Sequence, residues 1–203
     1  RHAASHYNHA MDVSHLLDGL NAAQREAVTA TDRHLLVLAG AGSGKTRVLV
    51  HRIAWQTQVV GVPPWGVLAV TFTNKAAREM RLRCEALMPD GTRGMWIGTF
   101  HGIAHRLLRQ HWQEAQLPET FQILDADDQL RSHELPLREP GLLGHYRQRF
   151  GTILIDEFQD TNALQYAFVR VLAGDTGSVL VVGDDDQSIY GWRGARVENV
   201  QHF

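Results

Sequence analysis

Five short apolar runs are spaced along the chain, with longer amphipathic stretches between them. The runs fall at residues 35–38, 67–71, 95–98, 153–155 and 179–182. Each run is continuous rather than alternating, and most consist of leucine and β-branched residues. Continuous runs of this length are typical of strands that are covered on both faces, as in a parallel sheet.

The stretches between the runs carry helical patterns. In one stretch, Ala77, Met80, Cys84 and Leu87 recur at spacings of three and four residues, which places them on one helix face. Strands and helices therefore alternate. The pattern predicts an α/β fold with a mostly parallel sheet flanked by helices. Because Cys84 lies in the apolar stripe, we expect it to be an inert core residue.

Two segments depart from this alternation. Residues 1–10 hold three of the twelve histidines and little that is apolar, so we interpret them as a leader or as residues added by cloning before Met11. Residues 113–149 mix three prolines with many charges and show no strand. We therefore expect one sheet domain, formed by residues 11–112 and 150–203, with helical pieces over 113–149 attached to it.

The composition fits a globular protein and excludes several classes. Of the 203 residues, 44% are hydrophobic and 21% are charged. The single cysteine excludes a disulfide scaffold, and no apolar run approaches the roughly 20 residues of a membrane helix. With no signal-peptide pattern near the start, these features predict a reduced, cytoplasmic setting without a membrane. The net charge of −2 argues against gripping duplex DNA by bulk charge, but it allows a local basic groove.

A glycine-rich loop follows the first apolar run and precedes a helical stretch. Its sequence, AGAGSGKT at residues 39–46, matches the phosphate-loop pattern except that Ala39 stands where the first glycine usually falls. Backbone N–H groups must converge on an anion in such a loop, and side chains would block their approach. Gly40, Gly42 and Gly44 are therefore small by necessity. The N-terminal end of the following helix adds positive charge.

Polar residues at this loop and after a later strand predict the two halves of a nucleotide-hydrolysing site. Lys45 is expected to neutralise the β- and γ-phosphates, and the Thr46 hydroxyl to bind Mg²⁺. Asp156 and Glu157 follow the apolar run at 153–155 directly. In this fold class such a strand end lies beside the phosphate loop, so we expect Asp156 to hold Mg²⁺ and Glu157 to activate the attacking water.

A third polar cluster follows the apolar run at 179–182. Gln187 is a candidate for sensing the γ-phosphate. Tyr190 and Trp192 lie within five residues of it, and exposed aromatics at such a place suggest stacking on nucleic-acid bases. Core packing remains open for Tyr190, whereas we favour exposure for Trp192 because its neighbours are polar. Arg193 is a candidate contact to a backbone phosphate.

Charge is polarised along the chain. Residues 74–111 hold seven lysines or arginines against three acids, and residues 156–199 hold eight acids against three arginines. We interpret Arg78 and Arg81 as part of an ordinary solvated helix face.

Two strand-to-helix junctions open this basic stretch, at residues 71–75 and 98–101. Helix N-termini and hydroxyl groups at such junctions can contact phosphates. Phe72 and Phe100 are candidates for packing under a strand of nucleic acid, and core packing is an open alternative for both.

Six motifs stand in an order that resembles superfamily 1 helicases of the UvrD/Rep/PcrA type. They are LNAAQ at 20–24, AGAGSGKT at 39–46, TFTNKAA at 71–77, GTFH at 98–101, IDEFQDT at 155–161 and VGDDDQSIYGWRG at 182–194. The resemblance implies a RecA-like P-loop NTPase domain that uses ATP and Mg²⁺ and acts on single-stranded and duplex DNA in DNA repair. DNA-repair proteins are further candidate partners.

The resemblance also implies roles for individual residues. Lys45, Glu157 and Gln187 are implied in catalysis, and Thr46 and Asp156 in metal binding. Gln24 is expected to read the adenine edge, and the remaining nucleotide contacts are expected from Ala41, Gly42, Ser43, Gly44, Lys45, Thr46 and Arg47. The single-stranded DNA path is expected to be lined by Phe72, Asn74, His101, Tyr190, Trp192 and Arg193. Hydrolysis would drive 3′→5′ translocation and strand separation.

Two departures from the family pattern bear on activity. A long helical insertion separates the GTFH and IDEFQDT motifs in the family, whereas only residues 102–154 separate them here. The insertion therefore looks truncated, with a join expected near residues 130–133. The chain also ends at Phe203, before the family's second motor domain. We therefore expect these residues alone to bind ATP weakly and to hydrolyse it poorly.

Two rival functions remain open at this stage. One is the motor of a helicase–nuclease subunit, although the opening residues from Met11 favour a repair helicase. The other is a nucleotide-regulated DNA-binding module without catalysis. Glu157 and Gln187 argue against that module, because a pure binder needs neither a general base nor a γ-phosphate sensor.

Overall fold

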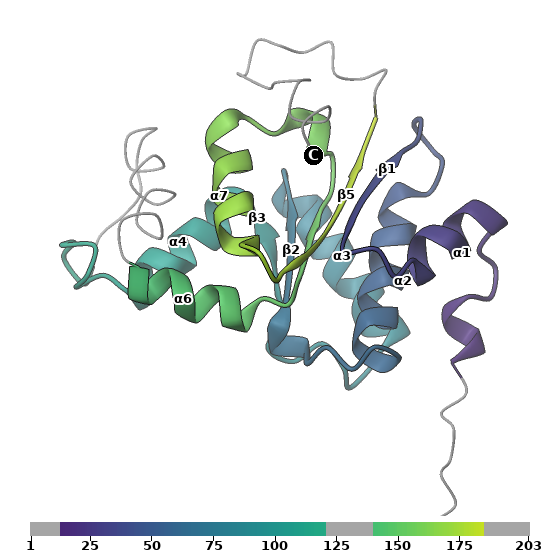
Figure 1. The fold of residues 1–203 in the computed structure, drawn as a ribbon, viewed down its shortest axis with the longest axis horizontal. Helices are drawn as coiled ribbons and strands as arrows, with labels where there is room; N and C mark the ends of the chain where they lie inside the picture. The colour runs from purple at the N-terminus through teal and green to yellow at the C-terminus, as the bar shows by residue number, and fades with distance from the viewer. Residues whose placement is uncertain (1–12, 121–139, 185–203) are drawn as a thin grey trace, which may run out of the picture.

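The computed structural model describes residues 13–120 and 140–184 of the chain (Figure 1). Within these residues, five strands form one sheet in the order β1-β5-β4-β2-β3, and all neighbouring strands are parallel. The strands are β1 (His34–Leu38), β2 (Val67–Thr71), β3 (Trp96–Thr99), β4 (Thr152–Ile155) and β5 (Ser178–Gly183). All five apolar runs are therefore strands, and the predicted α/β class is confirmed.

Helices cover both faces of this sheet. They are α1 (Ala22–Thr29), α2 (Lys45–Gln58), α3 (Asn74–Leu87), α4 (Phe100–Gln110), α6 (Pro140–Arg149) and α7 (Ala163–Ala173). Short 3-10 turns occupy Ser14–Leu16, Pro64–Gly66 and Phe158–Asp160. Helices α2 and α3 lie on one face with α1 packed outside α2, and α4, α6 and α7 lie on the other (Figure 1).

The continuous apolar character of the strands follows from this layering. In β2, Leu68 and Val70 enter the core beneath α4, α6 and α7, whereas Val67 and Ala69 enter the core beneath α2 and α3. Both sets must be apolar because successive side chains point to opposite faces of a sheet. Strands β2 and β4 are buried at every position, and the edge strand β1 is partly exposed.

The predicted helix stripe is also present. Ala77, Met80 and Cys84 are the buried residues of α3. Burial, with a further contribution from Glu85, raises the pKa of the Cys84 thiol to about 12. The thiolate is therefore suppressed at neutral pH, as expected for an inert core residue.

Parts of the segment at 113–149 and the leader fall outside the described residues. Within the described part, Tyr146 of α6 and Phe150, which directly follows this helix, belong to the core shared with α4 and α7. The predicted leader at 1–10 and the predicted join near 130–133 lie outside the described residues. Among residues 13–120 and 140–184, no helix is both long and apolar enough to cross a membrane.

Candidate functional site

The glycine-rich loop connects the end of β1 to the start of α2. Gly42 and Gly44 have φ values of +76° and +87°, a region that residues with a Cβ rarely adopt. Gly44 is the N-cap of α2, and a Cβ added there would stand 2.7 Å from Nε2 of Gln24. The loop thus needs glycine at both positions for its turn, and at Gly44 also for its close approach to α1.

Lys45, the first residue of α2, turns its ammonium group back under the loop. It donates to the carbonyl oxygens of Ala39 at 2.7 Å and Gly40 at 3.3 Å. It also forms an ion pair with Oδ2 of Asp184 at 3.2 Å. Lys45 and Asp184 are only 9% and 2% exposed. The pair therefore joins the loop after β1 to the residue that follows the neighbouring strand β5.

Thr46 contacts the acid that follows β4. Its hydroxyl donates to Oδ2 of Asp156 at 3.2 Å, and the Asp156 backbone N–H donates to the Val70 carbonyl of β2 at 2.9 Å. The carboxylate therefore lies beside the phosphate-loop hydroxyl, at the carboxyl edge of the sheet, as the strand-end argument predicted. Two hard oxygen donors side by side suit a small divalent cation.

The Asp156 carboxyl is buried beside another acid. Burial, and then the charge of Glu157, raise the pKa of Asp156 to about 6, although hydrogen bonds from Thr46 and the Glu157 backbone and the charge of Lys45 act the other way. The ionised form therefore costs stability in the folded protein. Acids with raised pKa values gather at functional sites, where a bound cation restores the charged form.

Asp156→Asn is expected to stabilise the protein in the absence of Mg²⁺, by about 1–3 kcal/mol at pH 8. A carboxyl with a folded pKa near 6 loses native-state stability as the pH rises from its ordinary value of 3.8 through 6, and asparagine removes this loss. The gain should vanish near pH 4. Urea unfolding at pH 4, 6 and 8 measures this gain in stability. An asparagine variant that is less stable than wild type at pH 8 would contradict the claim that the ionised Asp156 carboxylate destabilises the folded protein.

Glu157 stands at the start of the turn after β4 with a φ of +52°, a strained value for a residue with a side chain. Its Oε2 accepts a hydrogen bond from Nε2 of Gln159 at 2.6 Å. Oε1 of Gln159 in turn accepts from the backbone N–H of Asp184 at 3.0 Å. Gln159 is buried, so it fixes Glu157 relative to the end of β5.

Sequence reasoning missed the roles of Asp184 and Gln159. Together they connect Lys45 and Glu157 through short contacts across the ends of β4 and β5. A signal was present, because both residues lie in polar segments that directly follow buried strands. What the sequence alone did not reveal was that β4 and β5 are neighbours and that β5 also neighbours β1.

Gln24 and Arg47 lie at the outer side of the loop. Gln24 forms a capping box with Asn21 at the start of α1, and its Nε2 donates to the Ser43 carbonyl at 3.0 Å. A Cβ on Gly44 of the loop would stand 3.8 Å from Cβ of Arg47, and the Arg47 guanidinium lies beside Gly19. Both side chains therefore lie close to the loop, while their contacts to a nucleotide remain predictions.

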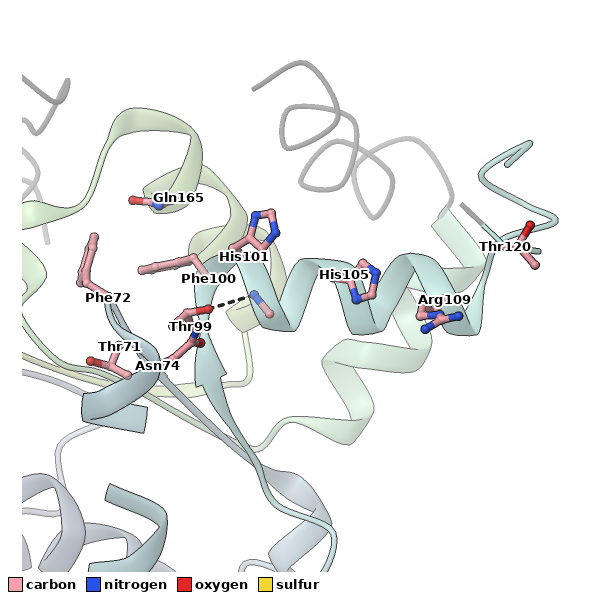
Figure 2. A pocket seen from close by; sticks show the side chains of 11 residues that line it. Thr71, Phe72, Asn74, Thr99, Phe100, His101, His105, Arg109, Thr120 and Gln165 are labelled. Atoms are coloured by element: carbon pink, nitrogen blue, oxygen red, sulfur yellow. Dashed lines mark hydrogen bonds between the residues drawn. The ribbon is translucent and has the colours of Figure 1, made fainter. Parts of the chain in front are cut away.

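A second site is a cavity of about 880 Å³ at the ends of β2 and β3 (Figure 2). Phe72, Asn74 and His101 line it, as do four residues that the sequence did not point to: His105, Arg109, Thr120 and Gln165. Phe72 meets Phe100 edge-on, with ring centroids 5.4 Å apart. Phe100 is only 3% exposed and packs in the core, whereas Phe72 is partly exposed.

Two helix N-termini open beside this cavity. The Thr73 hydroxyl accepts from the Ala76 N–H of α3, and the Thr99 hydroxyl accepts from the Gly102 N–H of α4. His101, His105 and Arg109 recur every four residues along α4 and lie along one side of it (Figure 2). This periodicity was a signal in the sequence for the two unanticipated lining residues of α4.

A scan against protein families finds the UvrD/REP helicase N-terminal domain over residues 20–137 and 130–203. The chain belongs to this family. DNA helicase II of Escherichia coli (strain K12) is 49% identical, and the match covers 95% of this chain and 37% of that protein. ATP-dependent DNA helicase PcrA of Bacillus subtilis (strain 168) is 36% identical, with 93% of this chain and 36% of that protein covered. The chain thus spans little more than a third of the length of these relatives.

The family membership confirms the resemblance drawn from the six motifs, and the parallel sheet agrees with the expected RecA-like P-loop architecture. The match to the Escherichia coli protein extends over 267 residues, more than the 203 of this chain, so the relative carries residues without a counterpart here. Gln187, Tyr190, Trp192 and Arg193 lie outside the described residues, and their assigned roles stay predictions.

Proposed function

We propose that this chain is the ATP-binding motor domain of a DNA helicase that moves 3′→5′ along single-stranded DNA and separates duplex DNA in DNA repair. The observation that carries the proposal is the joining of the two halves of the site. Lys45 and Thr46 of the loop each contact a carboxylate from a different strand end, Asp184 after β5 and Asp156 after β4. Relatives named DNA helicase II and ATP-dependent DNA helicase PcrA support it.

The loop fits a triphosphate. A Cβ added at Gly40 or Gly42 would meet nothing within 4 Å, so the glycines leave open space over the loop. Backbone N–H groups and the N-terminus of α2 face an anion in this arrangement, with the Lys45 ammonium beneath. We assign the β- and γ-phosphates to this space and the base to the side of Gln24 and Arg47.

The oxygen donors of Thr46 and Asp156 fit Mg²⁺, with Asp156 acting largely through water. The chemistry that the ion supplies when bound is neutralisation of charge on the phosphate oxygens. Glu157 accepts the proton of the attacking water on a carboxylate oxygen. Because Gln159 already donates to Oε2, Oε1 is the oxygen assigned to this proton.

The cavity at the ends of β2 and β3 is assigned to single-stranded DNA. Phe72 offers a ring for base stacking, and Asn74 and His101 lie at the N-termini of α3 and α4, where backbone phosphates are favoured. The route to the ATP site is short. Asp156 bonds the β2 carbonyl of Val70, and the cavity residues Thr71 and Phe72 follow directly. A shift of the β4 end on hydrolysis would therefore reach the DNA.

An unwinding assay on the longest natural chain that contains this sequence tests the proposal. We expect single-stranded DNA to stimulate ATP hydrolysis, and ATP to drive separation of a duplex with a 3′ single-stranded tail. A duplex with only a 5′ tail serves as the control and should stay paired. Hydrolysis indifferent to DNA, or separation of the 5′-tailed duplex alone, would contradict the proposal.

A further inference from the structure

Three arginines from two helices gather at the edge of the sheet where β3 lies. Arg78 and Arg81 of α3 and Arg106 of α4 line one cavity of about 390 Å³. Strand β3 is the last strand of the sheet on this side, and the helices α3 and α4 pack on its opposite faces. The arginines therefore meet over the open edge of β3.

Two of these side chains are fixed on a rigid support. A terminal nitrogen of Arg81 donates to the Ile97 carbonyl of β3 at 2.6 Å. The Arg106 guanidinium lies 4.1 Å from the ring centroid of Trp96, a fully buried residue of the same strand. Exposed arginines normally lose much rotamer freedom on binding a ligand, and these two are already ordered. Arg78 is exposed and has no such support among the described residues.

Within residues 13–120 and 140–184, none of the three arginines forms an ion pair. A further charge nearby is also positive, because Arg149 lies 5.1 Å from the same Trp96 ring. Burial lowers the pKa of Arg106, and Arg149 and Arg81 lower it further. By contrast, Arg83 on the same helix α3 pairs with Glu79. Concentrated like charge of this kind favours an anionic ligand.

The arginine cavity adjoins the cavity in Figure 2. Asn74, Thr99 and Gly102 line both of them, so the two spaces meet at the N-termini of α3 and α4. An extended anionic polymer lying in the first cavity can therefore continue into the second without crossing a barrier of apolar surface. Repeating phosphates along one strand match a row of guanidinium groups, which bind phosphate oxygens in pairs.

We propose that the cavity of Arg78, Arg81 and Arg106 is a second phosphate-binding site, which holds the sugar–phosphate backbone of the DNA strand as it passes over the β3 edge. The inference rests on the proposed function, since it extends the assigned DNA path. The ligand class is the phosphodiester backbone, so the contacts are independent of base sequence. The site would fix the register of the strand while Phe72 contacts its bases.

The salt dependence of DNA binding tests this inference. Affinity of the longest natural chain that contains this sequence for a fluorescein-labelled oligothymidylate is measured by anisotropy over a series of KCl concentrations. For every phosphate that is no longer neutralised, the plot of log affinity against log salt should flatten by about 0.7. We expect this change for Arg78→Gln and about twice it for the Arg78→Gln/Arg106→Gln pair. Arg83→Gln, which removes the same charge from the same helix, should leave the slope unchanged.

Further variants separate charge from packing. Arg78→Gln removes no described contact, so a folding defect cannot account for its effect. Arg106→Lys removes the planar stack on Trp96 but keeps the charge, and should retain most of the slope. A double variant with the wild-type slope would overturn this inference and leave the proposed function standing. An Arg78→Gln variant with the wild-type slope and a lowered melting temperature would also overturn it, because Arg78 would then be bound to a carboxylate of the protein and not to DNA. Wild-type protein that binds no oligonucleotide would overturn both.

Discussion

Replacing Glu157 by glutamine is expected to slow ATP hydrolysis by roughly 10²–10⁴-fold while nucleotide affinity stays near wild type. Glutamine keeps the shape of the side chain but cannot take a proton from water at neutral pH. Its amide can still contact Gln159, which holds the wild-type carboxylate at 2.6 Å. Single-turnover hydrolysis and titration with a fluorescent ATP analogue, both on the longest natural chain, separate the two effects.

Glu26→Gln is the matched control for this variant. Glu26 is an exposed acid on α1, two residues from Gln24, so it tests the loss of one carboxylate near the site without touching the proposed base. We expect the Glu26→Gln variant to hydrolyse ATP at the wild-type rate. If the Glu157 variant also hydrolysed ATP at the wild-type rate, another group would have to be the base. A module without catalysis would show no hydrolysis in any of these proteins.

Replacing Lys45 by methionine is expected to weaken both ATP binding and the fold. A charge-assisted hydrogen bond contributes about 1.5–3 kcal/mol, so ATP affinity should fall by roughly 10- to 150-fold. The free energy of unfolding should fall by about 3 kcal/mol, because Asp184 is buried and loses an ammonium group 3.2 Å away. Calorimetric titration with ATP and urea unfolding measure the two losses.

The double variant Lys45→Met/Asp184→Asn distinguishes binding from folding. Removing the uncompensated acid should restore most of the missing stability, since a neutral pair tolerates burial better than a lone charge. ATP affinity should remain at the level of the single variant. A single variant as stable as wild type would show that the ion pair does not hold the loop. If the double variant bound ATP as tightly as wild type, Lys45 would not be a phosphate ligand.

Much of the fold could be predicted because parallel strands must be apolar on both sides. The run at 67–71 coincides with β2, and the other four runs differ from their strands by a single residue at one or both ends. The phosphate loop could be predicted equally well, because its local backbone conformation requires glycine. Gly44 shows this need directly, with a φ of +87° and the Gln24 side chain where a Cβ would stand.

The contacts that join the site could not be predicted in the same way. Asp184 meets Lys45 because β5 lies between β1 and β4, and strand order is a property of the whole sheet. Arg78 and Arg81 are exposed, as expected for a solvated helix face, but the pattern of α3 alone does not show what lies beside them. In the structure, α4 brings Arg106 to the same cavity, and Arg81 bonds the edge strand. One helix considered by itself carries no information about its neighbour.

We propose that the loop at 39–46 and the acids after β4 form one triphosphate site. A crystal structure with Mg²⁺ and a non-hydrolysable ATP analogue tests it most directly. We expect phosphate oxygens about 3 Å from the backbone nitrogens of Gly42 and Gly44, and an ion about 2.1 Å from the Thr46 hydroxyl, with Asp156 close by. An analogue bound elsewhere, or an ion out of reach of both acids, would contradict it.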